Sequence, residues 1–126
     1  MKLDHLSHVN IRTTQLDAMI DWYTDFLGMH SGDRPNFSFP GAWMYVGDNA
    51  VVHLIGVEDE SGVGSEEPLK LEHFGFAATG GAEFEAKLRA DDTKYSRNDI
   101  PDFNLYLINL WDPDGNHLHL DFHMDE

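Results

Sequence analysis

The chain has 126 residues with a hydrophobic content of 41%, a globular composition that is long enough for one domain with its own core. Its 23 acidic and 8 basic residues give a formal net charge of −15, so nucleic acid and anionic membranes are poor candidate partners. The absence of cysteine excludes disulfides, thiolate nucleophiles and cysteine-ligated metal sites.

The first half of the sequence predicts a strand, a helix and then three more strands. We expect a strand over residues 6–12, a helix over 15–27, and strands around 37–39, 42–46 and 50–56. The helix carries apolar residues at i, i+3, i+4, i+7 and i+11 from Leu16, which form one stripe along its surface. Gly28 is placed to end this helix, because a left-handed residue is favoured there. Gly47-Asp48-Asn49 is typical of a hairpin turn between the last two strands.

The second half repeats the same order of elements. We expect a strand over residues 71–78, a shorter helix over 82–90, and strands over 94–97, 103–111 and 117–123. The segment 112–116, D-P-D-G-N, predicts a turn, because Pro and Gly occupy positions that a turn requires. The acidic segment 57–68 contains Gly and Ser without periodicity, which is typical of a linker. The sequence therefore predicts a single α+β domain, residues 1–126, with two β-α-β-β-β modules, 1–56 and 69–126.

Four histidines recur at matching places in the two modules. His8 and His73 are 73 − 8 = 65 residues apart, and His53 and His119 are 119 − 53 = 66 residues apart. All four interrupt short apolar runs that are typical of strands. Such a repeat indicates two copies of one unit that face each other. Because neutral imidazole is a common ligand of zinc, iron and nickel, these four residues, the four-histidine set, predict a metal site.

The last predicted strand has one polar and one apolar face. Its polar residues alternate with its apolar residues in the order His117, Leu118, His119, Leu120, Asp121, Phe122, His123, Met124. Because side chains alternate across a strand, we expect the apolar face to pack against the helices and the polar face to line a cleft.

Several motifs resemble those of the vicinal oxygen chelate superfamily of glyoxalases, bleomycin resistance proteins and extradiol dioxygenases. They are H-V-N-I at residues 8–11, D-W-Y-T-D-F-L-G-M at 21–29, L-E-H-F-G-F-A at 71–77 and D-P-D-G-N at 112–116. The resemblance covers nearly the whole chain. It implies paired β-α-β-β-β modules that form a curled, partly closed mixed sheet around a cleft with a divalent metal. The family's metal ligands lie on the first and last strand of each module. Carried over residue by residue, they are His8, His53, His73 and His119.

One departure from the family pattern concerns the carboxylate ligands. The family commonly has Glu or Gln at position 53 and Glu at position 119, where this chain has histidine. Four neutral ligands leave the ion its full charge, which favours strong Lewis acidity, and an imidazole has to replace glutamate as the base. The two-histidine, one-carboxylate triad of non-haem iron is also broken in this set. We expect Asp121 to orient an imidazole rather than to bind the metal.

Four further residues are candidates for substrate binding. Arg97, or Arg12 on the same strand face as His8, is suited to hold an anionic substrate group, because arginine binds carboxylates through two hydrogen bonds. Asn109 and Trp43 are expected to line the pocket. Alternatively, the arginines form structural ion pairs, the asparagine lies at a strand edge, and the tryptophan belongs to the core. The remaining histidines are expected at the surface: His5, His30, His117 and His123.

Three functions agree with these observations. The first is a divalent-metal-dependent lyase or isomerase of the glyoxalase type, in which the four-histidine set is catalytic and the substrate chelates the ion through neighbouring oxygens. The metal, Zn, Fe, Mn or Ni, stays open. The second is an extradiol-type dioxygenase with non-haem iron or manganese, and the third is a non-enzymatic drug-binding protein, for which the acidic charge favours a cationic ligand.

We further expect a cytoplasmic homodimer whose partner is a small-molecule substrate. The first residues lack the basic and apolar regions of a signal peptide. Apolar stretches are far shorter than the roughly 18 residues of a membrane span. A half-open sheet leaves edges and apolar faces that dimerisation covers.

Overall fold

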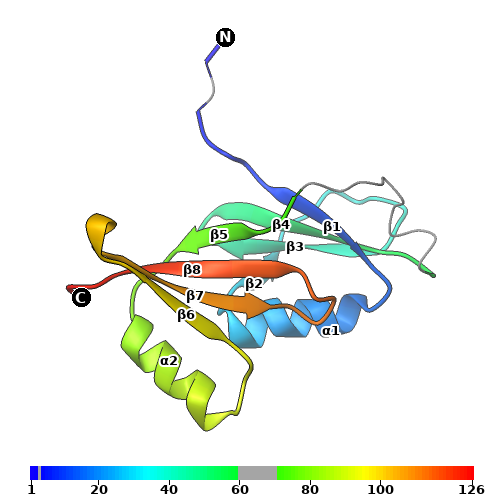
Figure 1. Ribbon diagram of the computed structural model, residues 1–126. Helices are drawn as coiled ribbons and strands as arrows, with labels where there is room; N and C mark the ends of the chain where they lie inside the picture. Colours follow the sequence, from blue (N-terminus) through cyan, green and yellow to red (C-terminus); the bar gives the residue numbers. More distant parts are fainter. Residues whose placement is uncertain (3, 60–70) are drawn as a thin grey trace. The chain divides into compact units, whose positions relative to one another are not determined.

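The chain forms two compact units, Met1–Pro68 and Leu69–Glu126. The computed structural model describes residues 1–2, 4–59 and 71–126, and Figure 1 shows its elements. Each unit contains one four-stranded mixed sheet and helical structure, so the expected α+β class and the two β-α-β-β-β modules are confirmed. Most of the predicted linker, from residue 60 onwards, lies outside the described residues. The joining of both sheets around one cleft stays a prediction.

The first module consists of a parallel outer strand and an antiparallel meander. Its elements are β1 (Val9–Thr13), α1 (Leu16–Asp21), the π-helical turn η1 (Trp22–Phe26), β2 (His30–Gly32), β3 (Gly41–Val46) and β4 (Asn49–Gly56). The strand order is β1-β4-β3-β2, in which β1 is parallel to β4 and the other pairs are antiparallel. Gly28, at φ +72°, follows the helical segment as expected.

Alternation along β3 and β4 separates the core of this module from its polar face. Met44 and Leu54 are buried, and α1, with its buried Met19, packs against these strands. Trp43 and His53, which are paired in register, point to the opposite face and are partly exposed. The sheet therefore presents one face to the helix and carries Trp43 and His53 on the other.

The expected strand over residues 37–39 is wrong. The N–H of Phe37 donates to the Pro35 carbonyl at 2.8 Å, which closes a γ-turn instead of a ladder. Pro35 and Pro40 flank this segment, and neither can donate a backbone hydrogen bond. The strand that pairs with the other edge of β3, away from β4, is β2, and its residues, His30–Gly32, come earlier in the chain.

The second module has the same topology. Its elements are β5 (Phe74–Ala77), α2 (Gly81–Ala90), β6 (Ser96–Ile100), the 3₁₀ turn η3 (Pro101–Phe103), β7 (Leu105–Trp111) and β8 (His117–His123). The strand order is β5-β8-β7-β6, with β5 parallel to β8. β6 extends further than expected, and β7 begins only after Asn104, whose φ of +56° ends the 3₁₀ turn. Within the described ranges, no helix of either module combines the length and apolar character needed to cross a bilayer.

The core of the second module lies on the helix side of β7 and β8. Ile108, Leu118 and Phe122 are buried there, and Leu88 of α2 is buried too. The predicted 112–116 turn is present: the buried Asp112 carboxylate accepts the N–H groups of Asp114 at 3.0 Å and Asn116 at 2.9 Å. This turn sets the register in which β7 and β8 pair, and with it the side chains that share the polar face.

Candidate metal site

The second predicted histidine pair is close together within its module. His73 directly precedes β5, and His119 lies in the neighbouring parallel strand β8. Their ring centroids are 4.5 Å apart. Asn109 pairs with His119 in register from β7, so it shares this polar face as expected.

His119 is held by a carboxylate and by a glycine. Its Nδ1 contacts Asp121 Oδ1 at 2.5 Å, a contact through which Asp121 can orient the ring. The ring lies against Gly75, where an added Cβ would be 2.7 Å from the His119 Cε1. Nε2 is therefore the nitrogen that remains for an ion, and a ligand imidazole commonly bonds a carboxylate through its other nitrogen.

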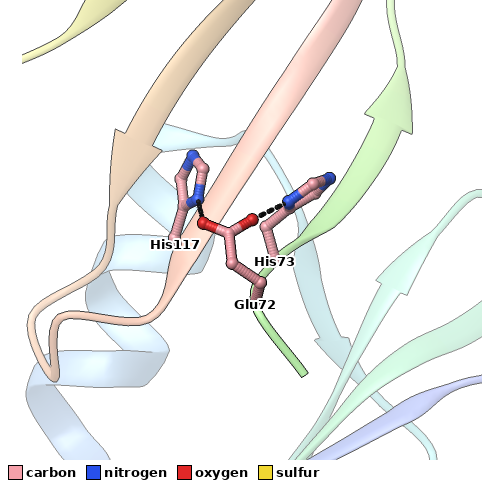
Figure 2. Close-up of side chains that lie close together, drawn as sticks. All are labelled: Glu72, His73 and His117. Atoms are coloured by element: carbon pink, nitrogen blue, oxygen red, sulfur yellow. Dashed lines mark hydrogen bonds and ion pairs between the residues drawn. The ribbon is translucent and has the colours of Figure 1, made fainter. Parts of the chain in front are cut away.

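A second group of ligand atoms lies beside this pair. Glu72, His73 and His117, the Glu72 cluster, each offer one metal-ligating atom, and these atoms all lie within 4.8 Å of one another. Figure 2 shows the Glu72 carboxylate between the two imidazoles, with one oxygen against His73 Nδ1 and the other 2.9 Å from His117 Nδ1. Hydrogen bonds from His73 and His117 lower the pKa of Glu72.

The sequence did not identify Glu72 or His117 as site residues. His117 was expected at the surface, but its side chain is only 20% exposed and both ring nitrogens have partners. Its Nε2 lies 2.9 Å from Asn109 Oδ1, and the Asn109 amide donates to Asn98 Oδ1 at 2.9 Å. The alternation that placed His119 on the polar face was the available signal for His117. Glu72 lies outside any strand, so alternation does not determine where its side chain points.

The first predicted pair is also together, in the first module. The rings of His8 and His53 stack at 3.9 Å with an interplanar angle of 9°, and His53 stacks on Trp43 at 4.0 Å. His8 directly precedes β1, two residues before Asn10, which pairs with His53, so alternation places His8 on the same face as His53. The three rings therefore form one continuous stack that includes the predicted pocket residue Trp43.

The free nitrogens of the first pair suit a divalent ion. His53 Nε2 lies 3.1 Å from the Ala50 carbonyl and His8 Nδ1 lies 3.0 Å from Ser7 Oγ, which leaves His53 Nδ1 and His8 Nε2 for an ion. Burial of the ring lowers the pKa of His53, the neighbouring His8 lowers it further, and the Ala50 contact partly offsets this. A neutral imidazole is the form that binds metal, so the donors of both modules fit a transition ion.

The two candidate arginines have different surroundings. Arg97 lies on the helix side of its sheet, where its guanidinium contacts Glu85 at 2.9 Å and Asp99 at 2.8 Å and covers the Tyr106 ring. It is therefore not brought to the face of Asn109. Arg12 is exposed on β1, two residues beyond Asn10, which pairs with His53. Arg12 thus shares the polar face of the first module with His53.

The chain matches the sequence profile of a known protein family. The profile of the Glyoxalase/Bleomycin resistance protein/Dioxygenase superfamily matches residues 5–120. No curated protein matches the sequence.

Solved structures with the same fold span nearly the whole chain. A glyoxylase/bleomycin resistance protein/dioxygenase domain from Frankia sp. is 18% identical, with a TM-score of 0.75, and the match covers 97% of this chain and 99% of that one. Lactoylglutathione lyase from Agrobacterium tumefaciens is 17% identical, with a TM-score of 0.71 and coverage of 97% and 96%. Trypanothione-dependent glyoxalase I from Leishmania major is 21% identical, with a TM-score of 0.64 and coverage of 94% and 86%. With a family match over residues 5–120, the chain belongs to the Glyoxalase/Bleomycin resistance protein/Dioxygenase superfamily.

Proposed function

We propose that the protein is a divalent-metal-dependent lyase or isomerase of the glyoxalase type, with the four-histidine set as its metal ligands. The observation that carries the proposal is the pairing of the predicted ligands within each module, His8 on His53 and His73 beside His119. Carboxylates contact Nδ1 of both second-module histidines, Glu72 on His73 and Asp121 on His119, as is common for ligand imidazoles.

The proposed reaction divides its tasks between the ion and the side chains. A divalent ion bound here supplies Lewis acidity towards a substrate with two neighbouring oxygens. The lowered pKa of His53 keeps its imidazole neutral at pH 7, the form that binds the ion. The Trp43 ring provides a flat apolar wall beside it, and Asn109 offers a polar contact on the other module.

An anionic group on the substrate requires a cation near the histidines. Arg12 is the better placed of the two candidates, because it shares the His53 face, whereas Arg97 is paired with Glu85 and Asp99. We propose that Arg12 makes this contact. Arg97 contributes only if its ion pairs with Glu85 and Asp99 break. The substrate is a small molecule, and the enzyme acts in the cytoplasm as a C₂ homodimer.

We infer candidate substrates from the names of two fold neighbours, and turnover tests them. These neighbours are a lactoylglutathione lyase and a trypanothione-dependent glyoxalase I. The first substrates to assay are therefore hemithioacetals of glutathione and of trypanothione, followed by 2-keto acids and acyl-CoA thioesters. The metal-loaded protein is expected to convert one of these classes.

The matching variant test uses His73→Ala, with His30→Ala as the control. His73→Ala is expected to lose most of the metal and the turnover while it stays folded. His30 lies on β2, away from the predicted ligands, and its loss should change neither property. Full metal loading of the wild-type protein without turnover of any of the three classes would remove the proposal.

The extradiol-type dioxygenase is the second candidate, and one observation favours it. The four-histidine set lacks a carboxylate, but Glu72 lies within ligand distance of two imidazoles, His73 and His117. Two histidines and one carboxylate form the donor set of non-haem iron oxygenases. Iron in protein purified from its native host would support this candidate, and zinc would contradict it.

A further inference from the structure

We propose that the second module binds a divalent transition-metal ion by itself, through Glu72, His73 and His117. This site has one carboxylate and needs no ligand from the first module. It differs from the four-histidine set in two of its three ligands, and it does not rest on the proposed function.

The register of the sheet brings the two imidazoles level with each other. Phe74 of β5 pairs with Leu118 of β8 in parallel, so His73 and His117, each one residue earlier, lie side by side at the start of adjacent strands. Their ring centroids are 5.2 Å apart. Both direct Nδ1 at the Glu72 carboxylate (Figure 2), so three donor atoms, two from the segment before β5 and one from β8, lie within 4.8 Å of one another.

His117 is held in this orientation from two sides. Its Nε2 contacts Asn109 Oδ1 at 2.9 Å, and its ring stacks on Trp111 at 5.3 Å. Asn109 is fixed in turn by donating to Asn98 Oδ1. An imidazole whose second nitrogen has a fixed partner keeps one tautomer and one direction, which is the usual support of a metal ligand. A surface histidine paired by chance with a carboxylate needs no such support.

The donor set has a distinct metal preference. Two imidazoles and one carboxylate on one side of an ion leave further positions open, and this arrangement suits Fe(II) as well as Zn(II) and Co(II). The carboxylate also cancels one charge of the ion, which the four-histidine set does not do. Glu72 thus supplies the anionic ligand that positions 53 and 119 lack in this chain.

Both sites use His73, through different nitrogens. The four-histidine set takes its Nε2, because Nδ1 contacts Glu72, whereas the Glu72 cluster takes its Nδ1. A neutral imidazole has one nitrogen free to bind an ion, so the two sites compete. The wild-type chain is therefore expected to bind about one equivalent of metal.

The test uses Co²⁺ and the full chain in which the first-module ligands are removed by His8→Ala and His53→Ala. This double variant is expected to keep about one equivalent of Co²⁺, with the visible absorption of a nitrogen- and oxygen-ligated ion. Adding either His117→Ala or Glu72→Gln should weaken Co²⁺ binding by at least about tenfold in calorimetric titration. The circular dichroism spectrum and the melting temperature without metal check that each variant is folded.

His123→Ala in the same background is the matched control. His123 lies on the same strand and the same alternation face as His117, but it is exposed and outside the Glu72 cluster. Its removal should leave the affinity for Co²⁺ unchanged.

The outcomes separate this site from the four-histidine set. A folded His8→Ala/His53→Ala variant that binds no Co²⁺, or His117→Ala that binds as tightly as His123→Ala, overturns the Glu72 site. If the double variant instead binds as tightly as the wild type and loses Co²⁺ with His117→Ala, the Glu72 site is supported and the four-histidine set fails.

Discussion

At the scale of single residues, small side chains decide where the histidines point. His119 rests on Gly75, because the partner strand offers no Cβ at the position in register with it. Asp121 then fixes the ring from the same strand, two residues further on. The orientation of this ligand therefore depends on a missing methyl group as much as on a hydrogen bond.

Gly75→Ala is expected to displace His119 without unfolding the module. The added methyl carbon would lie 2.7 Å from Cε1 and 2.9 Å from Nδ1 of the ring, closer than real contacts allow, so the imidazole must move and lose its Asp121 contact. Metal affinity should fall by about tenfold or more, as for other losses of ligand orientation. Calorimetric titration with Zn²⁺ measures the change.

Ala77→Gly is the control, because it changes one methyl group on the same face of β5 without touching His119 in register. Its metal affinity should match that of the wild type. An unchanged affinity for Gly75→Ala would mean that His119 is not a ligand.

Alternation along strands and the spacing of the repeat were the signals by which the sequence located candidate site residues, and His8 and His73, which directly precede a strand, were located by the repeat alone. His53 and His119 lie within strands, and the repeat located both. His117 lies on the same face, but the sequence predicted a strand over residues 71–78, in which Glu72 points away from His73, whereas β5 begins only at Phe74 and leaves Glu72 outside the strand. Arg97 was a candidate on charge alone, and only the register shows that its side chain points to the helix.

At the scale of elements, α2 is attached to its sheet by a network of charges. Glu85 of α2 is buried and accepts hydrogen bonds from Arg97 at 2.9 Å and Tyr95 at 3.1 Å. Arg97 also covers the Tyr106 ring at 4.0 Å. A buried carboxylate requires such partners, so Arg97 joins β6 and β7 to the helix.

Arg97→Ala is therefore expected to act on stability more than on substrate binding. It leaves the buried Glu85 carboxylate without its closest cation, and the free energy of unfolding should fall by about 1–2 kcal/mol after allowance for the partial exposure of the arginine. Urea denaturation measures this loss.

Arg12→Ala provides the comparison. Arg12 is exposed and lies on the histidine face, so its loss should raise KM for an anionic substrate and leave stability nearly unchanged. The reverse pattern, a higher KM for Arg97→Ala at unchanged stability, would assign the substrate contact to Arg97.

The elements themselves were largely predictable, and the failures have physical causes. The apolar stripe from Leu16 correctly predicted a helix, but the second half of this helix is the π-helical turn Trp22–Phe26. A π-helical turn differs from an α-helical one by a single residue in its hydrogen-bond spacing, so the apolar pattern does not distinguish the two. β8 coincides with its predicted range because alternation is uninterrupted there. The 37–39 prediction failed because aromatic residues favour strands in general, whereas the prolines on either side determine this segment.

At the scale of the whole molecule, the two modules repeat one topology with different ligand environments. In the first module His53 is stacked between two rings, His8 and Trp43. In the second module, His73 and His119 each contact a carboxylate. The two modules therefore share a topology but support their imidazoles differently, by ring stacking in the first and by carboxylates in the second.

Metal occupancy is expected to fall below about pH 6, because protons compete with the ion for neutral imidazoles.

The stability of the metal-free protein should also fall as the pH is lowered. The folded pKa of His53 is lowered, so the unfolded chain takes up its proton first, near pH 6.5, and the stability that neutral His53 contributes is lost as pH falls through that range. The folded pKa of Glu72 is also lowered, so its contribution persists down to about pH 4.5 and is lost as pH falls further. Elemental analysis after dialysis across this range, together with melting temperatures of the metal-free protein, checks both steps. A wild-type protein that retains its metal at pH 4.5 would contradict four neutral imidazole ligands, since a carboxylate-rich site alone resists protons to that pH.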